Sequence, residues 1–203
     1  MIITYFIILI VFLIIWKIIY NKFLNITYFK SDYDNQYYII RNDGSLEDKK
    51  KTAKLLAKIR IKLINFCNFL FNKYKSDKNL NKIKRFFNRL YPDNIIESPL
   101  DEYNTSYCIN KGQEIAICLR DKKNPDKFFE ENTIIYVLLH ELAHVMCISI
   151  GHGEEFTTNF MFLLNNAIEF KLWKPINYEK CPKPYCGITI MENLLDLEDS
   201  ECY

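Results

Sequence analysis

Residues 133–144 read TIIYVLLHELAH, an apolar run that ends in two histidines separated by three residues. Asn132 precedes the run and is a residue type that caps helices, so the sequence predicts a helix from residue 133. Residues four positions apart on a helix share one face, with Cβ atoms about 5–6 Å apart, so His140 and His144 can bind one metal ion. Glu141 would lie beside that ion and accept a proton from an attacking water molecule.

A third histidine supplies the remaining ligand. His152 follows His144 by eight residues and has a glycine on each side, which allows the helix to end and the chain to turn back. Three protein ligands leave one coordination position open, as in catalytic rather than structural zinc sites. We therefore expect one catalytic Zn²⁺ on His140, His144 and His152. Glu154 and Glu155 are competing third ligands, although acidic residues are favourable in the first turn of a helix without any metal.

The sequence around the motif predicts a mixed fold. Residues 103–109 and 114–119 are rich in β-forming residues and are joined by Asn110-Lys111-Gly112, which predicts a β-hairpin. After residue 153, apolar side chains recur at three- and four-residue intervals and predict a second helix packed against the first. These side chains are Phe156, Phe160, Leu163, Ala167 and Phe170. The expected fold class is α+β, with a small sheet packed on the helix that carries the two histidines.

Two basic helices are expected before this region. One spans residues 46–75 after a capping-box-like start at Ser45–Asp48, and the next runs from residue 79 until Pro92 stops it. Residues 46–91 hold fourteen lysines and arginines against three acids. Such a surface is usually a solvated helix face, and contact with anionic lipid or nucleic acid is the alternative. The net charge of the whole chain, +2, adds no support for a nucleic-acid partner.

The N-terminal sequence predicts a membrane anchor. Residues 2–16 carry no charge, and residues 18–20 extend the apolar run beyond Lys17. About 20 apolar helical residues cross the hydrocarbon core of a bilayer, and a lysine near the end can reach the headgroups. We therefore expect a transmembrane helix at residues 1–20, with a cleaved signal peptide and a buried core helix as the alternatives.

The flanking charges predict the orientation of this anchor. Lys17, Lys22 and Lys30 follow the span, and no basic residue precedes it. Because basic residues favour the cytoplasmic side, the chain is expected to be a single-pass membrane protein of a virion or host membrane, with its C-terminal domain in the cytosol.

The seven cysteines agree with a cytosolic location, because they are odd in number and irregularly spaced, as expected of reduced thiols. Cys181 and Cys186 are interpreted in the same way. The alternative for this pair is a second metal site shared with Cys202 or Cys108.

The motif also resembles a known family. Residues 140–144, HELAH, followed by residues 151–156, GHGEEF, resemble the zinc metallopeptidases of the WLM and SprT-like group. Residues 105–120 and the tail segment 185–187 resemble a branch of that group found in large DNA viruses and their relatives. The resemblance covers about residues 95–190.

The resemblance implies a compact, minimal zincin-like fold in which a small sheet lies over the active-site helix and an edge strand aligns an extended peptide. It also implies His140, His144 and His152 as zinc ligands and Glu141 as the base. Tyr185 is a weaker candidate for stabilising the oxyanion, since a phenol can donate a hydrogen bond to a tetrahedral intermediate.

Together these patterns predict four regions and one activity. The regions are a transmembrane anchor (1–20), a juxtamembrane segment (21–44) with a short strand at Tyr37–Ile40, a basic helical region (45–92) and a zincin-like metallopeptidase domain (93–203). The expected activity is hydrolysis of peptide bonds in a peptide or protein substrate by zinc-activated water, with Glu141 as general base. The alternatives are a non-catalytic, membrane-tethered zinc-binding protein and a DNA-associated protease of the SprT/WLM type.

Overall fold

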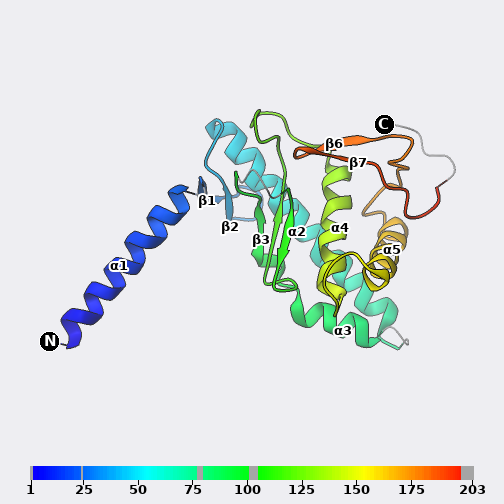
Figure 1. The fold of residues 1–203 in the computed structure, drawn as a ribbon, viewed down its shortest axis with the longest axis horizontal. Coiled ribbons are helices and arrows are strands. Elements are labelled where there is room, and N and C mark those ends of the chain that lie inside the picture. Colours follow the sequence, from blue (N-terminus) through cyan, green and yellow to red (C-terminus); the bar gives the residue numbers. More distant parts are fainter. Residues whose placement is uncertain (1, 24, 77–79, 101–104, 198–203) are drawn as a thin grey trace.

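A computed structural model of the chain describes residues 2–23, 25–76, 80–100 and 105–197. The helices are α1 (Ile2–Phe23), α2 (Leu46–Tyr74), α3 (Leu80–Arg89), the short 3-10 helix η1 (Pro92–Asn94), α4 (Glu131–Met146) and α5 (Glu154–Glu169). The strands are β1 (Ile26–Lys30), β2 (Tyr37–Arg41), β3 (Ile95–Glu97), β4 (Tyr107–Ile109), β5 (Glu114–Ile117), β6 (Lys183–Tyr185) and β7 (Ile188–Ile190). The predicted mixture of helices and small sheets is confirmed (Figure 1).

Helix α4 lies at the centre of the folded body, with strands on one side and α5 on the other (Figure 1). Apolar side chains are buried nearly all round it, as expected of a core helix. They are Ile134, Ile135, Leu138, Leu139, Leu142, Ala143, Val145 and Met146. The predicted cap was wrong, because the helix begins after Glu130. Asn132 instead exchanges two hydrogen bonds of 2.8 and 2.9 Å with the backbone of Lys174, in the segment after α5.

The sheet next to α4 has the strand order β3-β5-β4. β4 and β5 pair antiparallel, so the predicted hairpin is confirmed, although residues 103–104 of its predicted first strand lie outside the described residues. The turn residues Asn110, Lys111 and Gly112 all have positive φ. β3, which was not predicted, pairs parallel to β5. Ile115, Ala116 and Ile117 are consecutive and all buried, so both faces of the central strand are covered.

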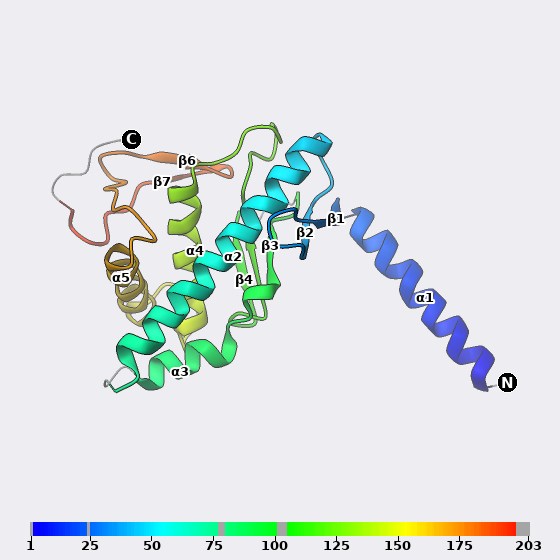
Figure 2. The same ribbon diagram turned by 180° about the vertical axis from the view of Figure 1, so that it is seen from behind.

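The predicted long helix is confirmed as α2, which lies across the back of the molecule (Figure 2). It begins with a capping box in which Ser45 Oγ accepts from the Asp48 backbone N–H at 3.1 Å, and the Asp48 carboxylate accepts from the Ser45 backbone N–H at 2.9 Å. Its buried face carries the predicted apolar positions Leu56, Ile59, Leu63, Phe66 and Leu70. The second predicted helix is α3, and residue 79, its predicted start, lies outside the described residues.

Several cations of the basic region serve the fold itself. Lys62 of α2 pairs with Glu131 at the start of α4, and Lys73 pairs with Glu169 at the end of α5. Part of the basic surface is therefore neutralised by acids from other helices. A contact of residues 46–91 with lipid or nucleic acid stays a prediction.

The segment before α2 is attached to the sheet by buried charges. The strand predicted at Tyr37–Ile40 is present as β2, paired with the unpredicted β1. At its end, Arg41 and Arg120 are both fully buried and share the buried Glu97. Glu97 accepts from the Arg120 Nε at 2.7 Å and from the Arg41 backbone N–H at 2.7 Å, and Asp43 lies 3.1 and 3.2 Å from the two guanidinium groups. This buried network joins β2, β3 and the segment after β5.

Helix α1 extends away from the folded body in both ribbon views (Figures 1 and 2). A membrane-spanning helix needs about 20 predominantly apolar residues. The side chains described for α1 run from residue 4 to residue 20 and include Lys17. Within the described part of the chain, no helix has the length and apolar character that crossing a membrane requires. This finding contradicts the transmembrane anchor predicted at residues 1–20, and with it the single-pass localisation and the cytosolic orientation derived from it.

Candidate active site

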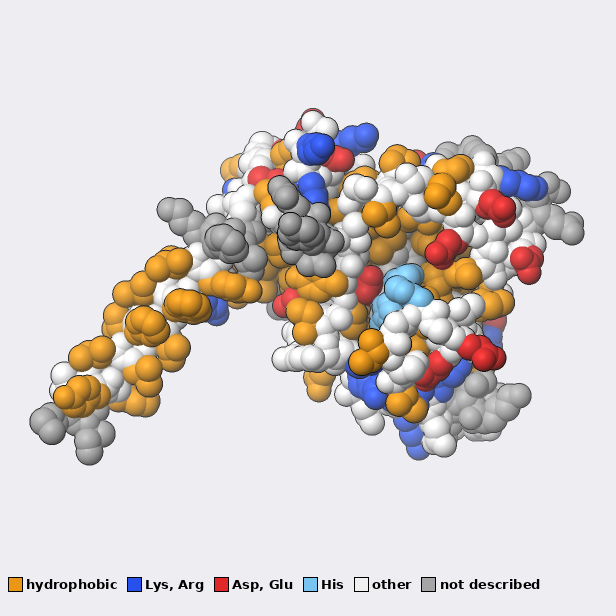
Figure 3. Space-filling model, viewed as in Figure 1, with side chains coloured by type: hydrophobic (Ala, Val, Ile, Leu, Met, Phe, Trp, Pro, Cys, Tyr) orange, Lys and Arg blue, Asp and Glu red, His pale blue; other side chains and the backbone are white. Residues whose placement is uncertain are grey.

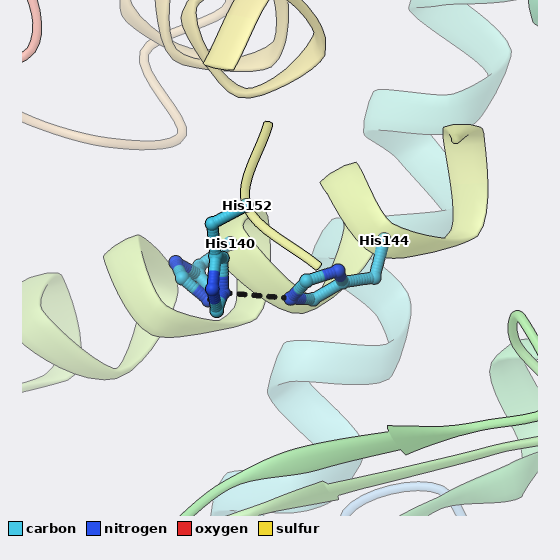
Figure 4. Close-up of side chains that lie close together, drawn as sticks. All are labelled: His140, His144 and His152. Carbon is cyan, nitrogen blue, oxygen red and sulfur yellow. Dashed lines mark hydrogen bonds between the residues drawn. The ribbon is translucent and has the colours of Figure 1, made fainter. Parts of the chain in front are cut away.

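The three histidines of the chain converge on one point (Figure 4). His140 and His144 come from successive turns of α4, and His152 comes from the loop between α4 and α5. The His152 Nε2 atom lies 3.1 Å from the His140 Nε2 atom and 3.2 Å from the His144 Nε2 atom. The structure therefore brings together the predicted ligand set.

The geometry of this cluster fits a tetrahedral zinc ion. Zinc–nitrogen bonds of about 2.0–2.1 Å at tetrahedral angles place two ligand nitrogens about 3.3 Å apart, close to the separations seen here. Burial, followed by repulsion from the neighbouring imidazoles, lowers the pKa of His140 to about 3. Burial and His152 lower the pKa of His144 to about 4. Both rings are thus neutral at pH 7, the protonation state in which imidazole binds a metal.

An aromatic ring supports all three imidazoles. The Phe156 ring centroid lies 4.8 Å from that of His140, 4.5 Å from that of His144 and 4.6 Å from that of His152. Phe156 was predicted only as part of the apolar face of α5. Its position next to the cluster could not be read from helical periodicity, because it depends on how the α4–α5 loop turns back.

Glu141 projects into the same site and is 5% exposed. Burial raises the pKa of its carboxyl group to about 8. A carboxyl group whose pKa lies near the working pH can both accept and return a proton, which is the property needed of a general base that later acts as an acid. The position of Glu141 agrees with its predicted role, which stays a prediction.

A cavity of about 980 Å³ opens beside the histidines, which reach the surface near the middle of the folded body (Figure 3, pale blue). One wall is formed by residues 105–108, at and before β4, and the other by residues 188–192, at and after β7. Tyr136, Val137 and three residues of the HELAH motif of α4 also line the cavity, and residues 150–152 border it.

Tyr185 also lines this cavity, but its hydroxyl is already engaged. Its side chain is 1% exposed, and its hydroxyl oxygen lies 3.0 Å from Ser106 Oγ. Ser106 Oγ in turn accepts from the Cys118 backbone N–H at 3.1 Å. Burial raises the pKa of the Tyr185 phenol. The structure therefore places Tyr185 at the site, while its suggested role as an oxyanion donor stays a prediction.

The prediction of reduced thiols was wrong for Cys118, Cys181 and Cys186. A disulfide joins Cys186, in the turn between β6 and β7, to Cys118, directly after β5. Cys181 is also disulfide-bonded, whereas Cys67, Cys108 and Cys147 are free thiols. Cys202, proposed as a partner in a second metal site, lies outside the described residues. The 68-residue separation of Cys118 and Cys186 gives no local signal of their pairing.

Two arginines of α3 bind the C-terminal end of α4, the helix that carries His140 and His144. Arg85 Nε donates to the Met146 carbonyl at 3.0 Å, and Arg89 Nη1 donates to the Val145 and Cys147 carbonyls at 3.2 and 2.7 Å. The last carbonyls of a helix have no partner within it and carry its negative dipole end, so cations there are favourable. From the sequence, these two arginines were predicted only to lie in a basic helix, and their contact with the end of α4 was not predicted.

The alternative ligands Glu154 and Glu155 are not part of the histidine cluster. Glu154 is exposed. The Glu155 carboxylate is directed at the backbone of the α4–α5 loop, where it accepts hydrogen bonds from Ile148 and Ser149.

Comparisons with known proteins show which proteins this chain is similar to. Residues 106–174 match the WLM domain family. The chain is 37% identical over 172 residues to protein R325 of Acanthamoeba polyphaga mimivirus, covering 83% of this chain and 84% of that one. It is 40% identical over 90 residues to protein 136R of Invertebrate iridescent virus 6, covering 42% of this chain and 50% of that one. The crystal structure of Wss1 from Saccharomyces cerevisiae is similar with a TM-score of 0.37 and 23% identity, over 46% of this chain and 79% of that one.

Proposed function

Because the chain belongs to the WLM family of proteases, in the form found in large DNA viruses, we propose that it is a zinc-dependent peptidase. The observation that carries this proposal is the convergence of three imidazoles on one point beside a buried glutamate in an open cavity.

His140, His144 and His152 would hold the zinc ion. When bound, zinc supplies Lewis acidity, which polarises a carbonyl group and makes a water molecule more acidic near neutral pH. Glu141 would accept the proton of the attacking water and deliver it to the nitrogen of the departing amine. Its burial suits both steps, because it raises the pKa of the carboxyl group toward the pH at which the protein would work. A carboxyl group with such a pKa can both accept a proton and release it.

The substrate we propose is an extended peptide. β4 is an edge strand of the sheet, and its residues Tyr107 and Cys108 line the cavity. An edge strand offers backbone N–H and C=O groups with which a peptide can pair as an additional strand. A peptide bound in this way would lie beside the HELAH motif of α4, with its side chains alternating between the cavity and solvent.

The test compares the wild type with Glu141→Gln in peptidase assays on an unstructured protein substrate, with zinc content measured on the same samples. We expect the variant to keep one zinc ion per chain and to lose at least about 100-fold in turnover, the lower end of a general base's contribution. Glu154→Gln, which removes an equal charge at an exposed position outside the cavity lining, serves as a control for handling and stability. Near-wild-type turnover of Glu141→Gln with full zinc content would refute the proposed role of Glu141.

A further inference from the structure

We propose that Glu155 is a positioning residue that fixes the α4–α5 loop so that His152 completes the metal site. This inference rests on the proposed zinc-dependent function. It assigns a role to a residue that spacing alone left as a competing ligand.

Glu155 accepts three hydrogen bonds from two loop residues. Its Oε1 atom accepts from the Ile148 backbone N–H at 2.9 Å. Its Oε2 atom accepts from the Ser149 backbone N–H at 2.9 Å and from Ser149 Oγ at 2.6 Å. These bonds, that to the Ser149 hydroxyl first, lower the pKa of Glu155 to about 2, so the carboxylate is ionised at every pH at which the protein would work. Both oxygens are thus committed to the loop rather than to the metal.

The loop has little else to hold it. Ile148, Ser149, Gly151 and His152 are exposed, and Ile150 is 93% exposed. A side-chain carbon placed on Gly151 would meet no atom within 4 Å. Burial of apolar surface therefore contributes little to the conformation of this loop, and hydrogen bonds to its backbone have to define it.

The remaining contacts connect the same loop to its surroundings. Lys111, in the β4–β5 turn, donates to the Ser149 carbonyl. Arg85 lies with its Nη2 atom 3.6 Å from Glu155 Oε1 while its Nε atom binds the Met146 carbonyl. Arg85 thus joins the end of α4 to the carboxylate that organises the loop. Glu155, a residue of α5, therefore contacts both Arg85 of α3 and the backbone of the loop.

The position of His152 follows from this arrangement. Ser149 is three residues before His152, and Glu155 is three residues after it, so their hydrogen bonds close a short loop around the histidine. A metal ligand has to be held within about 0.5 Å of its productive position to contribute its full affinity. Loss of the Glu155 carboxylate would free the N-terminal part of the loop and leave His152 held by its contacts with Phe156 and with the imidazoles of His140 and His144.

Zinc affinity measured on the full chain tests the inference. The wild type, Glu155→Ala, Glu155→Gln and Ser149→Ala are titrated with zinc in competition with a chromophoric chelator. Groups that orient metal ligands typically contribute 10- to 100-fold to affinity, so we expect Glu155→Ala to weaken zinc binding by about that factor. Glu155→Gln should lose less zinc affinity than Glu155→Ala, because its amide oxygen can still accept a hydrogen bond from the loop. It should still lose some affinity, because its NH₂ group cannot accept the other hydrogen bonds. Ser149→Ala, which removes a single bond, should lose least. Glu154→Gln is the matched control, because it removes an equal charge from the same helical turn, and should change affinity less than about twofold.

A double-mutant cycle with His152→Ala separates positioning from a general structural effect. If Glu155 acts by placing His152, its removal in the His152→Ala background costs no further affinity. Equal losses in both backgrounds, or wild-type affinity in Glu155→Ala, would overturn the inference. Thermal unfolding of the metal-free variants shows whether they are folded at the assay temperature. If Glu155→Ala is unfolded at that temperature, the same double-mutant cycle is measured with Ser149→Ala in its place. A wild type that binds no zinc would refute the proposed function itself and this inference with it.

Discussion

Replacing Glu97 by glutamine should destabilise the protein strongly, although Glu97 takes no part in the candidate active site. Glu97 is fully buried and binds the fully buried Arg120 through both carboxylate oxygens, at 2.7 and 3.2 Å, and the Arg41 backbone at 2.7 Å. The substitution keeps the volume but removes one negative charge, so that two buried guanidinium groups are left with Asp43. Removing one partner of a buried ion pair costs about 3–5 kcal/mol.

For a chain of this length, each kcal/mol lowers the unfolding midpoint by about 2–4 °C, so we expect a decrease of about 6–20 °C. Unfolding followed by circular dichroism, in heat and in urea, measures the change. Asp93→Asn is the control, because Asp93 pairs with Arg60 at the surface and such pairs contribute about 0–1 kcal/mol. A free energy of unfolding for Glu97→Gln within about 1 kcal/mol of wild type would refute the view that the buried network joins the segment before α2 to the sheet.

Three further predictions concern the metal site and the disulfide. Chelation of zinc should lower the unfolding midpoint of the wild type, because a ligand that binds only the native state stabilises it, and the decrease should be absent in His140→Ala; an equal decrease in both proteins would contradict the site. In the metal-free protein, His140 and His144 have pKa values of about 3 and 4, below their usual 6.5, so the unfolded state takes up more protons and stability should fall as pH decreases below about 6.5. Glu141, with a pKa of about 8 instead of 4.5, acts in the opposite sense, so its contribution should reduce stability as pH rises from about 4.5 to 8. Urea unfolding measured from pH 4 to 9 should therefore show maximum stability at a pH between 4.5 and 8. In Glu141→Gln this maximum should move to higher pH. Replacing both Cys118 and Cys186 by serine opens a cross-link of 68 residues and should lower the free energy of unfolding by about 4 kcal/mol, measured against the wild type under non-reducing conditions; no difference would show that the bridge does not form in solution.

The local features of the site could be predicted from the sequence because they depend on short-range geometry. The spacing of His140 and His144 on one helix face, and the glycines beside His152, require only helix periodicity and backbone freedom. The hairpin around Asn110 and the capping box at Ser45 are local in the same sense, and the structure contains both.

The features that were missed depend on contacts between distant residues. Arg41 and Glu97 are 56 positions apart, and Arg85 and Met146 are 61 positions apart, so neither pair leaves a local pattern. β3 has three residues and pairs in parallel, which is too short for a periodic signal. The error at residues 1–20 has another origin: an apolar sequence pattern was extended to a function, membrane crossing, that the described helices do not support.

Two borders of the cavity, the β6–β7 segment and the α4–α5 loop, are held by different kinds of bond. The β6–β7 segment is cross-linked through Cys186 to Cys118, directly after β5, and is hydrogen-bonded through Tyr185 to Ser106. The side that carries Ile150 and His152 is an exposed loop held by non-covalent contacts. If the proposed function holds, adjustment to peptides of different bulk falls to that loop. Because the same loop carries His152, a peptide that displaced it would also move one of the three proposed zinc ligands.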